Sequence, residues 1–327
     1  MTDVPAVRRA AALLRAGGLV AIPTETVYGL AADTENPAAV LRIFAAKGRP
    51  SFHPLIVHIA SGDKLNHWAS TVPDSAQRLA ERFWPGPLTM ILPRSERVPG
   101  VVTGDLPTVG LRVPAHPLTQ ALLKEFGGGL AAPSANRFGR VSPTTAEHVR
   151  EELGERVDLI LDGGPCQVGL ESTIVDLSGP IPTLLRPGAI TPEQLAEILP
   201  DLVLTPGETA AHCSGRLDSH YAPQAQVETV SPAELPGRLA MAFQEPIAVL
   251  AAISPQTARS ITWLEMPGDP VAYAQQLYAR LREVDQLGIG KALVVLPPET
   301  GIGLAIADRV RKAAAPRPTA GSQVRRS

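Results

Sequence analysis

Three hydroxyl side chains and a carboxylate crowd into PTETVYGL at 23–30, directly after the apolar run 19–22. Pro23 cannot donate a hydrogen bond to a sheet, so a strand over this run is expected to end there. Hydroxyls and a carboxylate at a strand end can bind a polar ligand. A polar capping loop explains the segment, taken alone, about equally well.

Basic side chains occur singly beside other apolar stretches. KGRP at 47–50 places Lys47 and Arg49 at the exit of a predicted helix, where the helix macrodipole by itself favours cations. His58 lies inside the apolar stretch HPLIVHI, which taken alone is typical of a core histidine. Arg112 alternates with the apolar residues of TVGLRVP, so we expect it to have an anionic partner, either an internal carboxylate or a ligand.

Further hydroxyl and basic side chains follow later apolar runs. Ser134 and Ser142 lie in APSANRFGRVSPT, Ser172 lies in ESTIVDL, and Arg186 lies in LLRPG. Each segment is a weak signal alone, but the repetition is informative. Hydroxyls at several strand ends, together with several Lys and Arg, predict a concave site for a ligand that carries phosphate and carboxylate groups.

Familiar catalytic motifs are missing from the sequence. It contains no G-x-x-x-x-G-K-[ST], and its Gly-rich stretches GIGKAL and GIGLAI lack the third glycine of a dinucleotide fingerprint. It also has no G-x-S-x-G elbow and no H-E-x-x-H helix. A Walker-type ATPase, a Rossmann dehydrogenase, a serine hydrolase and a zincin are therefore all disfavoured.

The composition is that of a globular protein with room for two cores. The chain has 327 residues, of which 44% are hydrophobic and 19% charged. Its 30 Lys and Arg balance 32 Asp and Glu, so the molecule lacks the basic excess of a protein that binds nucleic acid mainly through phosphates. Cys166 and Cys213 form no CxxC pair, which disfavours a zinc site and a disulfide framework. No signal-peptide core or run of about 20 apolar residues is present, so we expect no membrane contact and a cytoplasmic location.

Apolar runs that alternate with amphipathic stretches predict an α/β fold. In the first part of the chain, helices are predicted over 4–16 and 37–47, the second with Asn36 as N-cap and Gly48 after its end. Strands are predicted over 19–22, 54–59, 88–92, 109–113, 129–132, 158–161, 172–177 and 182–186.

A second, smaller α/β unit follows a segment without apolar periodicity. The boundaries we predict are a catalytic domain over 1–204, a linker or lid over 205–223, a small domain over 224–315 and a disordered tail over 316–327. Within the small domain, strands are expected over 226–230, 247–253, 261–266 and 292–297, and helices over 270–285 and 301–315.

The ordered motifs PTETVYGL, KGRP, HPLIVHI, LTMIL, VGLRVP, APSAN, SPT, ESTIVD and LLRPG resemble those of the YrdC-like threonylcarbamoyl-AMP synthases. The resemblance covers roughly residues 5–200. The SHYAP segment and the unit after it resemble the long form of that family, which has an additional C-terminal domain. The resemblance implies a twisted, mainly parallel sheet with surrounding helices about a large, positively charged cavity, plus a small Rossmann-like C-terminal domain.

The resemblance also implies roles for individual residues. L-Threonine would be bound by Thr26, His58, Arg112, the backbone at Ala132, and Ser172. ATP would be bound by Lys47, Arg49, His53, Thr108, Ser134, Ser142, Arg186 and Tyr221. His53 stands where many relatives have Asn, which leaves its side-chain contact in question. Tyr221, in SHYAP, would fold back over the nucleotide, although the preceding HCSGRLD departs from the common linker.

Such enzymes join L-threonine, bicarbonate or carbon dioxide, and ATP into threonylcarbamoyl-AMP and pyrophosphate. Magnesium would accompany ATP as cofactor. No residue is expected to act as a covalent catalyst, and no protein metal site is expected, because positioning and charge neutralisation suffice for this chemistry. The product would pass to a separate transferase complex that modifies the adenosine next to the anticodon of ANN-decoding tRNAs, with at most weak direct tRNA contact.

Two other functions stay open from the sequence. One is an RNA-binding module that uses Arg137 and Arg140, which would bind RNA with a steep salt dependence. The other is a carbamoyl transferase acting on a protein partner, which would require carbamoyl phosphate as donor.

Overall fold

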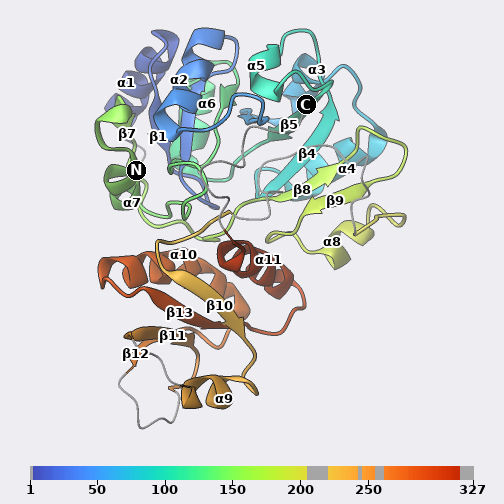
Figure 1. Ribbon diagram of the computed structural model, residues 1–327. Coiled ribbons are helices and arrows are strands. Elements are labelled where there is room, and N and C mark those ends of the chain that lie inside the picture. Colours follow the sequence, from blue (N-terminus) through green and yellow to red (C-terminus); the bar gives the residue numbers. More distant parts are fainter. Residues whose placement is uncertain (1–2, 205–219, 242–244, 255–260, 317–327) are drawn as a thin grey trace. The chain divides into compact units, whose positions relative to one another are not determined.

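A computed structural model of the chain describes residues 3–204, 220–241, 245–254 and 261–316, which fold into two compact units (Figure 1). The first unit holds the described residues up to Phe138 and from Ser142 to 204. The second unit holds Gly139–Val141 and the described residues from His220 onward. The predicted linker and tail lie largely outside the described residues, so those boundaries stay predictions.

The first unit is built on one large sheet. Its strand order is β7-β1-β2-β6-β3-β5-β4-β8-β9. The strands are β1 (Val20–Ile22), β2 (Gly29–Asp33), β3 (Ile56–His58), β4 (Leu88–Pro93), β5 (Thr108–Arg112), β6 (Leu130–Ala131), β7 (Leu159–Ile160), β8 (Thr173–Asp176) and β9 (Thr183–Arg186). All eight predicted strands of this unit are present with slightly different ends.

The sheet is mixed in strand direction. The pairs β1–β7, β3–β5 and β4–β8 are parallel, and the other five described pairs are antiparallel. The α/β class with a large, helix-covered sheet is confirmed, but parallel pairing holds for only these three pairs. The difference arises partly at β2, which the sequence analysis did not predict and which turns the chain back antiparallel to β1.

Helices cover both faces of this sheet. They are α1 (Val4–Arg15), α2 (Pro37–Lys47), α3 (Leu65–Trp68), α4 (Asp74–Phe83), α5 (Gly100–Thr103), α6 (Pro117–Phe126), α7 (Ala146–Leu153) and α8 (Pro192–Ala196), with 3-10 turns η1 (Gly62–Lys64) and η2 (Gly154–Arg156). Alternation along β1 explains the layering: Val20 and Ile22 join the apolar cluster of α1 and α6, while Ala21 joins that of α2.

Helix α2 begins and ends at the predicted residues. The Asn36 side chain accepts from the backbone N–H of Ala39 at 3.2 Å and caps its start. Gly48 ends it with φ 63°, in the left-handed region that glycine tolerates best. The basic pair Lys47 and Arg49 is thereby fixed at the helix exit.

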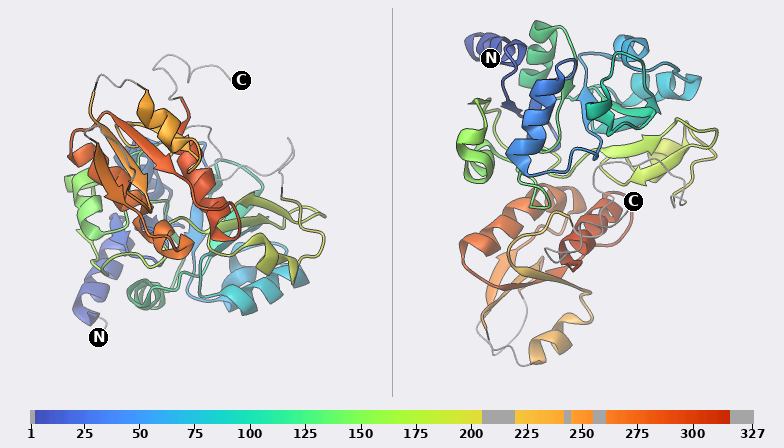
Figure 2. Two further views of the ribbon diagram at one scale, coloured as in Figure 1. Left: turned by 90° about the horizontal axis from the view of Figure 1, so that it is seen from below. Right: turned by 45° about the horizontal axis from the view of Figure 1, so that its top comes forward.

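The second unit is a small parallel sheet between helices. Its strand order is β10-β13-β11-β12, and all three described pairs are parallel. The strands are β10 (Gln226–Val230), β11 (Ile247–Ala251), β12 (Thr262–Glu265) and β13 (Lys291–Val295). Helix α9 (Leu235–Ala240) packs against one face, and α10 (Pro270–Gln286) and α11 (Ile302–Ala314) lie on the other (Figures 1 and 2). This arrangement agrees with the predicted Rossmann-like unit.

The three residues Gly139–Val141 are built into the second unit. The Gly139 carbonyl accepts from Ala222 N–H at 3.0 Å, and the Val141 carbonyl accepts from the buried Arg282. Arg140 pairs with Asp285 at 3.3 Å. The Asp285 carboxylate also accepts from the backbone N–H groups of residues 224 and 225, at 2.7 and 3.0 Å. One carboxylate thus joins two stretches that are far apart in sequence.

Among the described residues, no helix has the length and apolar character needed to cross a membrane.

Candidate active site

The segment Pro23–Tyr28 joins β1 to β2 and is buried along its whole length. The Pro23 carbonyl accepts from the Thr119 hydroxyl, and the Glu25 carbonyl accepts from the N–H of Val168 at 2.7 Å. Tyr28 donates its N–H to the Pro143 carbonyl at 2.9 Å. The segment therefore contacts several loops, which explains why a strand connection needs so many polar groups.

Two threonines give this segment its local shape. The Thr24 hydroxyl donates to the Val27 carbonyl at 2.6 Å and accepts from the N–H groups of Thr26 and Val27, both at 3.2 Å. The Thr24 and Thr26 hydroxyl oxygens are 2.8 Å apart. Because the Thr24 proton goes to the Val27 carbonyl, we assign Thr26 as the donor between the two hydroxyls.

Arg112, at the end of β5, is buried against this segment. Its Nη2 lies 2.7 Å from Glu25 Oε1 and its Nη1 donates to Thr26 Oγ1 at 2.9 Å. Its Nε donates to the Gly86 carbonyl at 3.3 Å. Of the two anionic partners predicted for Arg112, the internal carboxylate is present. A contact with the threonine carboxylate stays a prediction.

His58 ends β3 beside Arg112. It is 3% exposed, and its Nδ1 has no hydrogen-bond partner among the described residues. Burial, and then the nearby Arg112 charge, lower the pKa of His58 to about 3. The imidazole is therefore neutral near pH 7, and its buried Nδ1 is suited to a ligand hydrogen bond.

Ser172 and Arg186 bring the two predicted substrate halves together. Ser172, assigned to threonine, lies before β8, and Arg186, assigned to ATP, ends β9. Arg186 Nη2 donates to Ser172 Oγ at 3.1 Å, and Nε donates to the Ser172 carbonyl at 3.0 Å. Ser172 Oγ is also 2.8 Å from Thr89 Oγ1. The two side chains are thus held in one buried network.

Lys47 organises the loop that contains Ser134. It is 3% exposed, and its ammonium donates to the carbonyl of Ser134 and, at 2.5 Å, to that of Asn136. Burial, followed by the Arg49 charge, holds the pKa of Lys47 well below its usual value. In this structure Lys47 fixes the APSAN loop, and its predicted role near the phosphates stays a prediction.

Arg49 and His53 both lie against Phe138. The Arg49 guanidinium is 5.9 Å from the ring centre of Phe138, and the His53 ring centre is 5.2 Å from it. Arg49 also donates to the Pro54 carbonyl at 2.9 Å. The structure therefore brings together these two predicted nucleotide residues, next to an aromatic ring.

Ser142, Ala132 and Thr108 have different surroundings. Ser142 Oγ donates to Glu171 Oε1 at 2.6 Å, and both side chains are buried. The N–H of Ala132 donates to the Ile56 carbonyl at 3.0 Å, and the predicted ligand contact with the backbone at Ala132 stays a prediction. Thr108 begins β5 whereas Arg112 ends it, which separates them by roughly 13 Å at about 3.3 Å per residue.

Tyr221 belongs to the second unit. Its side chain is 1% exposed, its ring stacks on Tyr278 at 5.9 Å, and the Arg309 guanidinium lies 5.3 Å from the ring centre. Its backbone has a φ of 60°, a left-handed conformation unusual for tyrosine. The predicted contact of Tyr221 with the nucleotide stays a prediction.

Glu25 and Glu171 are the residues that the sequence analysis missed. Each is buried and holds a predicted ligand residue, Arg112 for Glu25 and Ser142 for Glu171. Their position offered a signal, because each is an acidic residue directly beside a predicted site residue in PTET and EST. Without the fold, neither partner could be identified.

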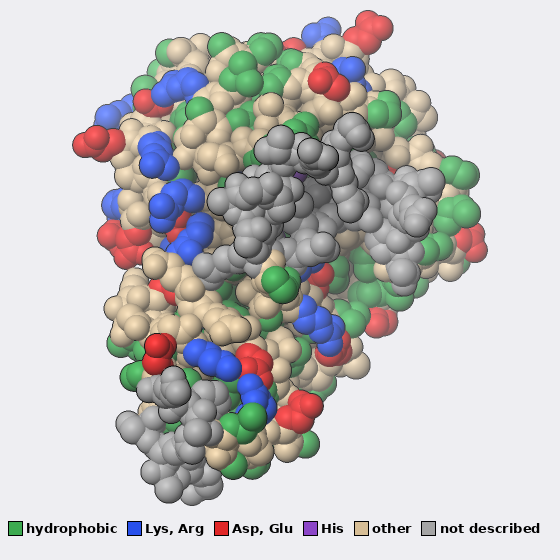
Figure 3. Space-filling view, in the orientation of Figure 1, with side chains coloured by type: hydrophobic (Ala, Val, Ile, Leu, Met, Phe, Trp, Pro, Cys, Tyr) green, Lys and Arg blue, Asp and Glu red, His purple; other side chains and the backbone are tan. Residues whose placement is uncertain are grey.

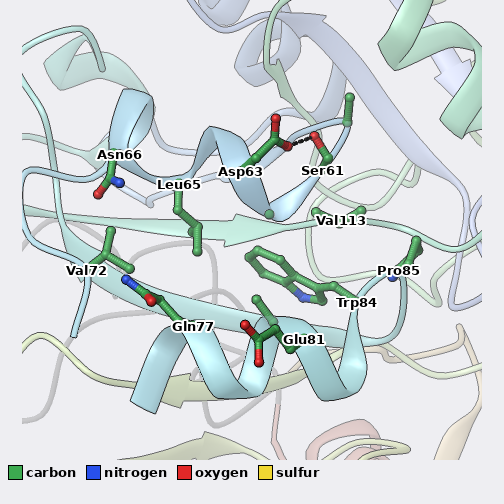
Figure 4. A pocket seen from close by; sticks show the side chains of 13 residues that line it. Ser61, Asp63, Leu65, Asn66, Val72, Gln77, Glu81, Trp84, Pro85 and Val113 are labelled. Atoms are coloured by element: carbon green, nitrogen blue, oxygen red, sulfur yellow. Dashed lines mark hydrogen bonds between the residues drawn. The ribbon is translucent and has the colours of Figure 1, made fainter. Parts of the chain in front are cut away.

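A pocket of about 490 Å³ lies elsewhere in the first unit, between η1, α3, α4 and the end of β5 (Figure 4). Asp63, Glu81 and the Trp84 ring are among its lining residues, and none of the predicted site residues is. Its acidic lining differs from the predicted positively charged cavity.

On the molecular face in Figure 3, Lys and Arg side chains are interspersed with Asp and Glu, unlike a uniformly basic nucleic-acid surface.

Family models match most of the chain. The Sua5/YciO/YrdC model, described as telomere recombination, matches residues 12–188. A model described as the C-terminal domain of threonylcarbamoyl-AMP synthase matches residues 190–315.

Individual proteins are similar over nearly the full length. The threonylcarbamoyl-AMP synthase of Pyrococcus abyssi is 42% identical, over 94% of this chain and 93% of that protein. The protein of the same name from Bacillus subtilis is 40% identical, over 96% of this chain and 94% of its own length. A crystal structure of P. abyssi Sua5 complexed with L-threonine has a TM-score of 0.85 and 38% identity, covering 94% of each chain.

Proposed function

The chain belongs to the threonylcarbamoyl-AMP synthase family, and from this premise we propose the reaction that its site carries out. The protein is a nucleotidyltransferase that joins L-threonine, bicarbonate or carbon dioxide, and ATP. Its products are threonylcarbamoyl-AMP and pyrophosphate.

The contact between Ser172 and Arg186 is the observation that best supports this reaction. Ser172 is assigned to threonine and Arg186 to ATP, and the two side chains are 3.1 Å apart. A site that joins a threonine derivative to the α-phosphate must bring its two substrates into contact. The hydrogen bond between these residues is where that contact is expected.

The proposed chemistry needs no protein nucleophile. The neutral amine of threonine attacks carbon dioxide, forms a C–N bond and loses a proton to give a carbamate. A carbamate oxygen then attacks the α-phosphorus of ATP, and the bond to the β-phosphate oxygen breaks as pyrophosphate leaves. Arg112 would bind the threonine carboxylate, and the cations Lys47, Arg49 and Arg186 would offset the charge on the phosphates.

Magnesium would enter with ATP, bound to the phosphate oxygens. The predicted nucleotide residues are mostly cations and hydroxyls, which suit phosphate oxygens better than a metal ion. Among the described residues, no group of three or more His, Cys, Asp or Glu could hold a metal by itself. Bound to ATP, the ion would share the charge that develops on pyrophosphate.

The product is a reactive mixed anhydride, so we place the protein upstream of a separate transferase complex. That complex would transfer the threonylcarbamoyl group to the adenosine next to the anticodon of ANN-decoding tRNAs. The protein itself would make at most weak tRNA contact and would act in the cytoplasm, where its product is used.

Substrate omission tests the proposal. Purified protein is incubated with MgATP, bicarbonate and L-threonine, and pyrophosphate and threonylcarbamoyl-AMP are measured, the latter by mass spectrometry. Pyrophosphate should appear only when all three substrates are present. Equal release without threonine would reject the function. Activity that requires carbamoyl phosphate would instead indicate a carbamoyl transferase.

A further inference from the structure

Glu25 is buried beside the residues assigned to L-threonine but is not among them. Its side chain is 7% exposed, and its two oxygens have different partners. Oε1 accepts from Arg112 Nη2 at 2.7 Å, and Oε2 accepts from the backbone N–H of Ala115 at 2.9 Å. Because both oxygens have a donor inside the protein, Glu25 is better placed to hold its neighbours than to bind substrate.

Arg112 depends on these contacts for its orientation. Its Nη2 donates to Glu25, its Nη1 donates to Thr26 and its Nε donates to the Gly86 carbonyl. Its side chain is only 5% exposed, so without Glu25 it would be a buried, uncompensated cation. A guanidinium that is held in one orientation can bind a carboxylate with less loss of side-chain entropy.

The same contacts fix the direction of the Thr26 hydroxyl. Arg112 Nη1 donates to Thr26 Oγ1 at 2.9 Å, and Thr26 donates onward to Thr24, whose own proton goes to the Val27 carbonyl. The hydrogen bonds therefore all run one way, from Arg112 to Val27. With this assignment, Thr26 offers a ligand its remaining lone pair, which suits the amine or hydroxyl group of threonine rather than its carboxylate.

We propose that Glu25 is a positioning residue for L-threonine. It holds Arg112 ready for the substrate carboxylate and, through Arg112, keeps Thr26 as an acceptor for the substrate amine or hydroxyl. This inference rests on the proposed function, since it concerns the threonine half of that site.

Calorimetric titration of L-threonine and of ATP, each into Glu25→Ala, Glu25→Gln and wild-type protein, tests the role. We expect Glu25→Ala to raise the Kd of threonine at least tenfold and to leave that of ATP within twofold. Glu25→Gln should restore part of the affinity, because its single amide oxygen can still accept from one of the two donors. Glu147→Gln is the matched control, since Glu147 pairs with Arg150 on the exposed surface.

Two results would overturn the role. One is equal weakening of threonine and ATP, which indicates general damage to the fold. The other is unchanged threonine affinity in both variants. If Glu25→Ala does not fold, Glu25→Gln decides alone, with at least a threefold rise in the Kd of threonine expected. Wild-type protein that binds ATP but no threonine would reject the proposed function itself, and that result is distinct from a failure of Glu25.

Discussion

His58 and Arg112 are register partners at the ends of the parallel strands β3 and β5. Partners in a parallel pair point to the same face of the sheet, so a guanidinium and an imidazole share one buried surface. Burial, and then the Arg112 cation, lower the pKa of His58 to about 3. The pair can therefore bind a carboxylate without carrying two positive charges.

The depressed pKa of His58 predicts a loss of stability in acid. Unfolded His58 binds a proton below about pH 6.5, while folded His58 does not until about pH 3. The unfolded state therefore gains relative stability as pH falls through this window. On acidification from pH 7 to pH 4.5, His58 should lower the free energy of unfolding by roughly 2–3 kcal/mol.

Denaturant unfolding of wild-type and His58→Leu protein at both pH values measures this contribution of His58 to the free energy of unfolding. The variant should lose less stability on acidification than wild type by about that amount. His67→Leu, on the exposed side of α3, is the control and should behave as wild type. If His58→Leu and wild type lose the same stability on acidification, the claim that folded His58 stays neutral is wrong.

Arg112 and Arg186 should affect different substrates. Arg112→Ala is expected to weaken L-threonine at least tenfold, about 1.4 kcal/mol, with little effect on ATP, and Arg186→Ala is expected to do the reverse. Titration calorimetry with each ligand measures the division. Because Arg112→Ala leaves Glu25 buried without its cation, about 3–5 kcal/mol of stability should also be lost, so folding is checked first by circular dichroism. Matching losses of both ligands in both variants would show that the division is wrong.

Cys166 should be unreactive in the folded protein. Its thiol is 7% exposed, and burial raises its pKa to about 12, with a further rise from the Glu25 charge. At pH 8 the thiolate fraction is then about a thousandfold lower than at the ordinary pKa of 9. In a Cys213→Ser background, iodoacetamide labelling at pH 8 should proceed only after denaturant is added. Rapid labelling of the native protein would contradict this environment.

Asp285 should stabilise the second unit. Its carboxylate accepts from two backbone N–H groups and pairs with Arg140, so Asp285→Ala leaves three donors without this partner. We expect a loss of about 2–4 kcal/mol and faster hydrogen exchange in residues 139–141 and 222–225. Glu283→Ala is the control on the same helix, because Glu283 pairs with Arg280 of α10 itself. Equal exchange in the two variants would remove Asp285 from this role.

Much of the fold was predictable because local patterns and tertiary packing agree. Asn36 and Gly48 delimit α2 as expected, and every predicted strand is present. Helices α3 to α9 were not predicted; in α4 the apolar residues recur at helical spacing, but its N-cap position is Pro73 and no side chain caps it. Strand β2 was missed because its GLAAD sequence is short and lacks β-branched residues.

The sequence pointed to several polar residues that the structure buries, but not to their partners, and their substrate roles stay predictions. Thr26 and Arg112 are separated by 86 positions, yet they share a hydrogen bond. No spacing rule relates them, because they meet only where the end of β5 packs against the segment Pro23–Tyr28 in the folded protein. For the same reason the sequence left two partners possible for Arg112, and only the structure identifies Glu25 as one of them.

The capture of Gly139–Val141 by the second unit limits how the protein can be dissected. The chain passes between the units three times, after Phe138, after Val141 and again before His220. A single cut near residue 205 therefore does not yield two complete modules. The N-terminal fragment would keep Gly139–Val141, which directly precede Ser142. It would lose the residues that bind this segment, namely Ala222, Arg282 and Asp285. A chimaera that takes its second unit from a relative would therefore also need the relative's counterpart of Gly139–Val141.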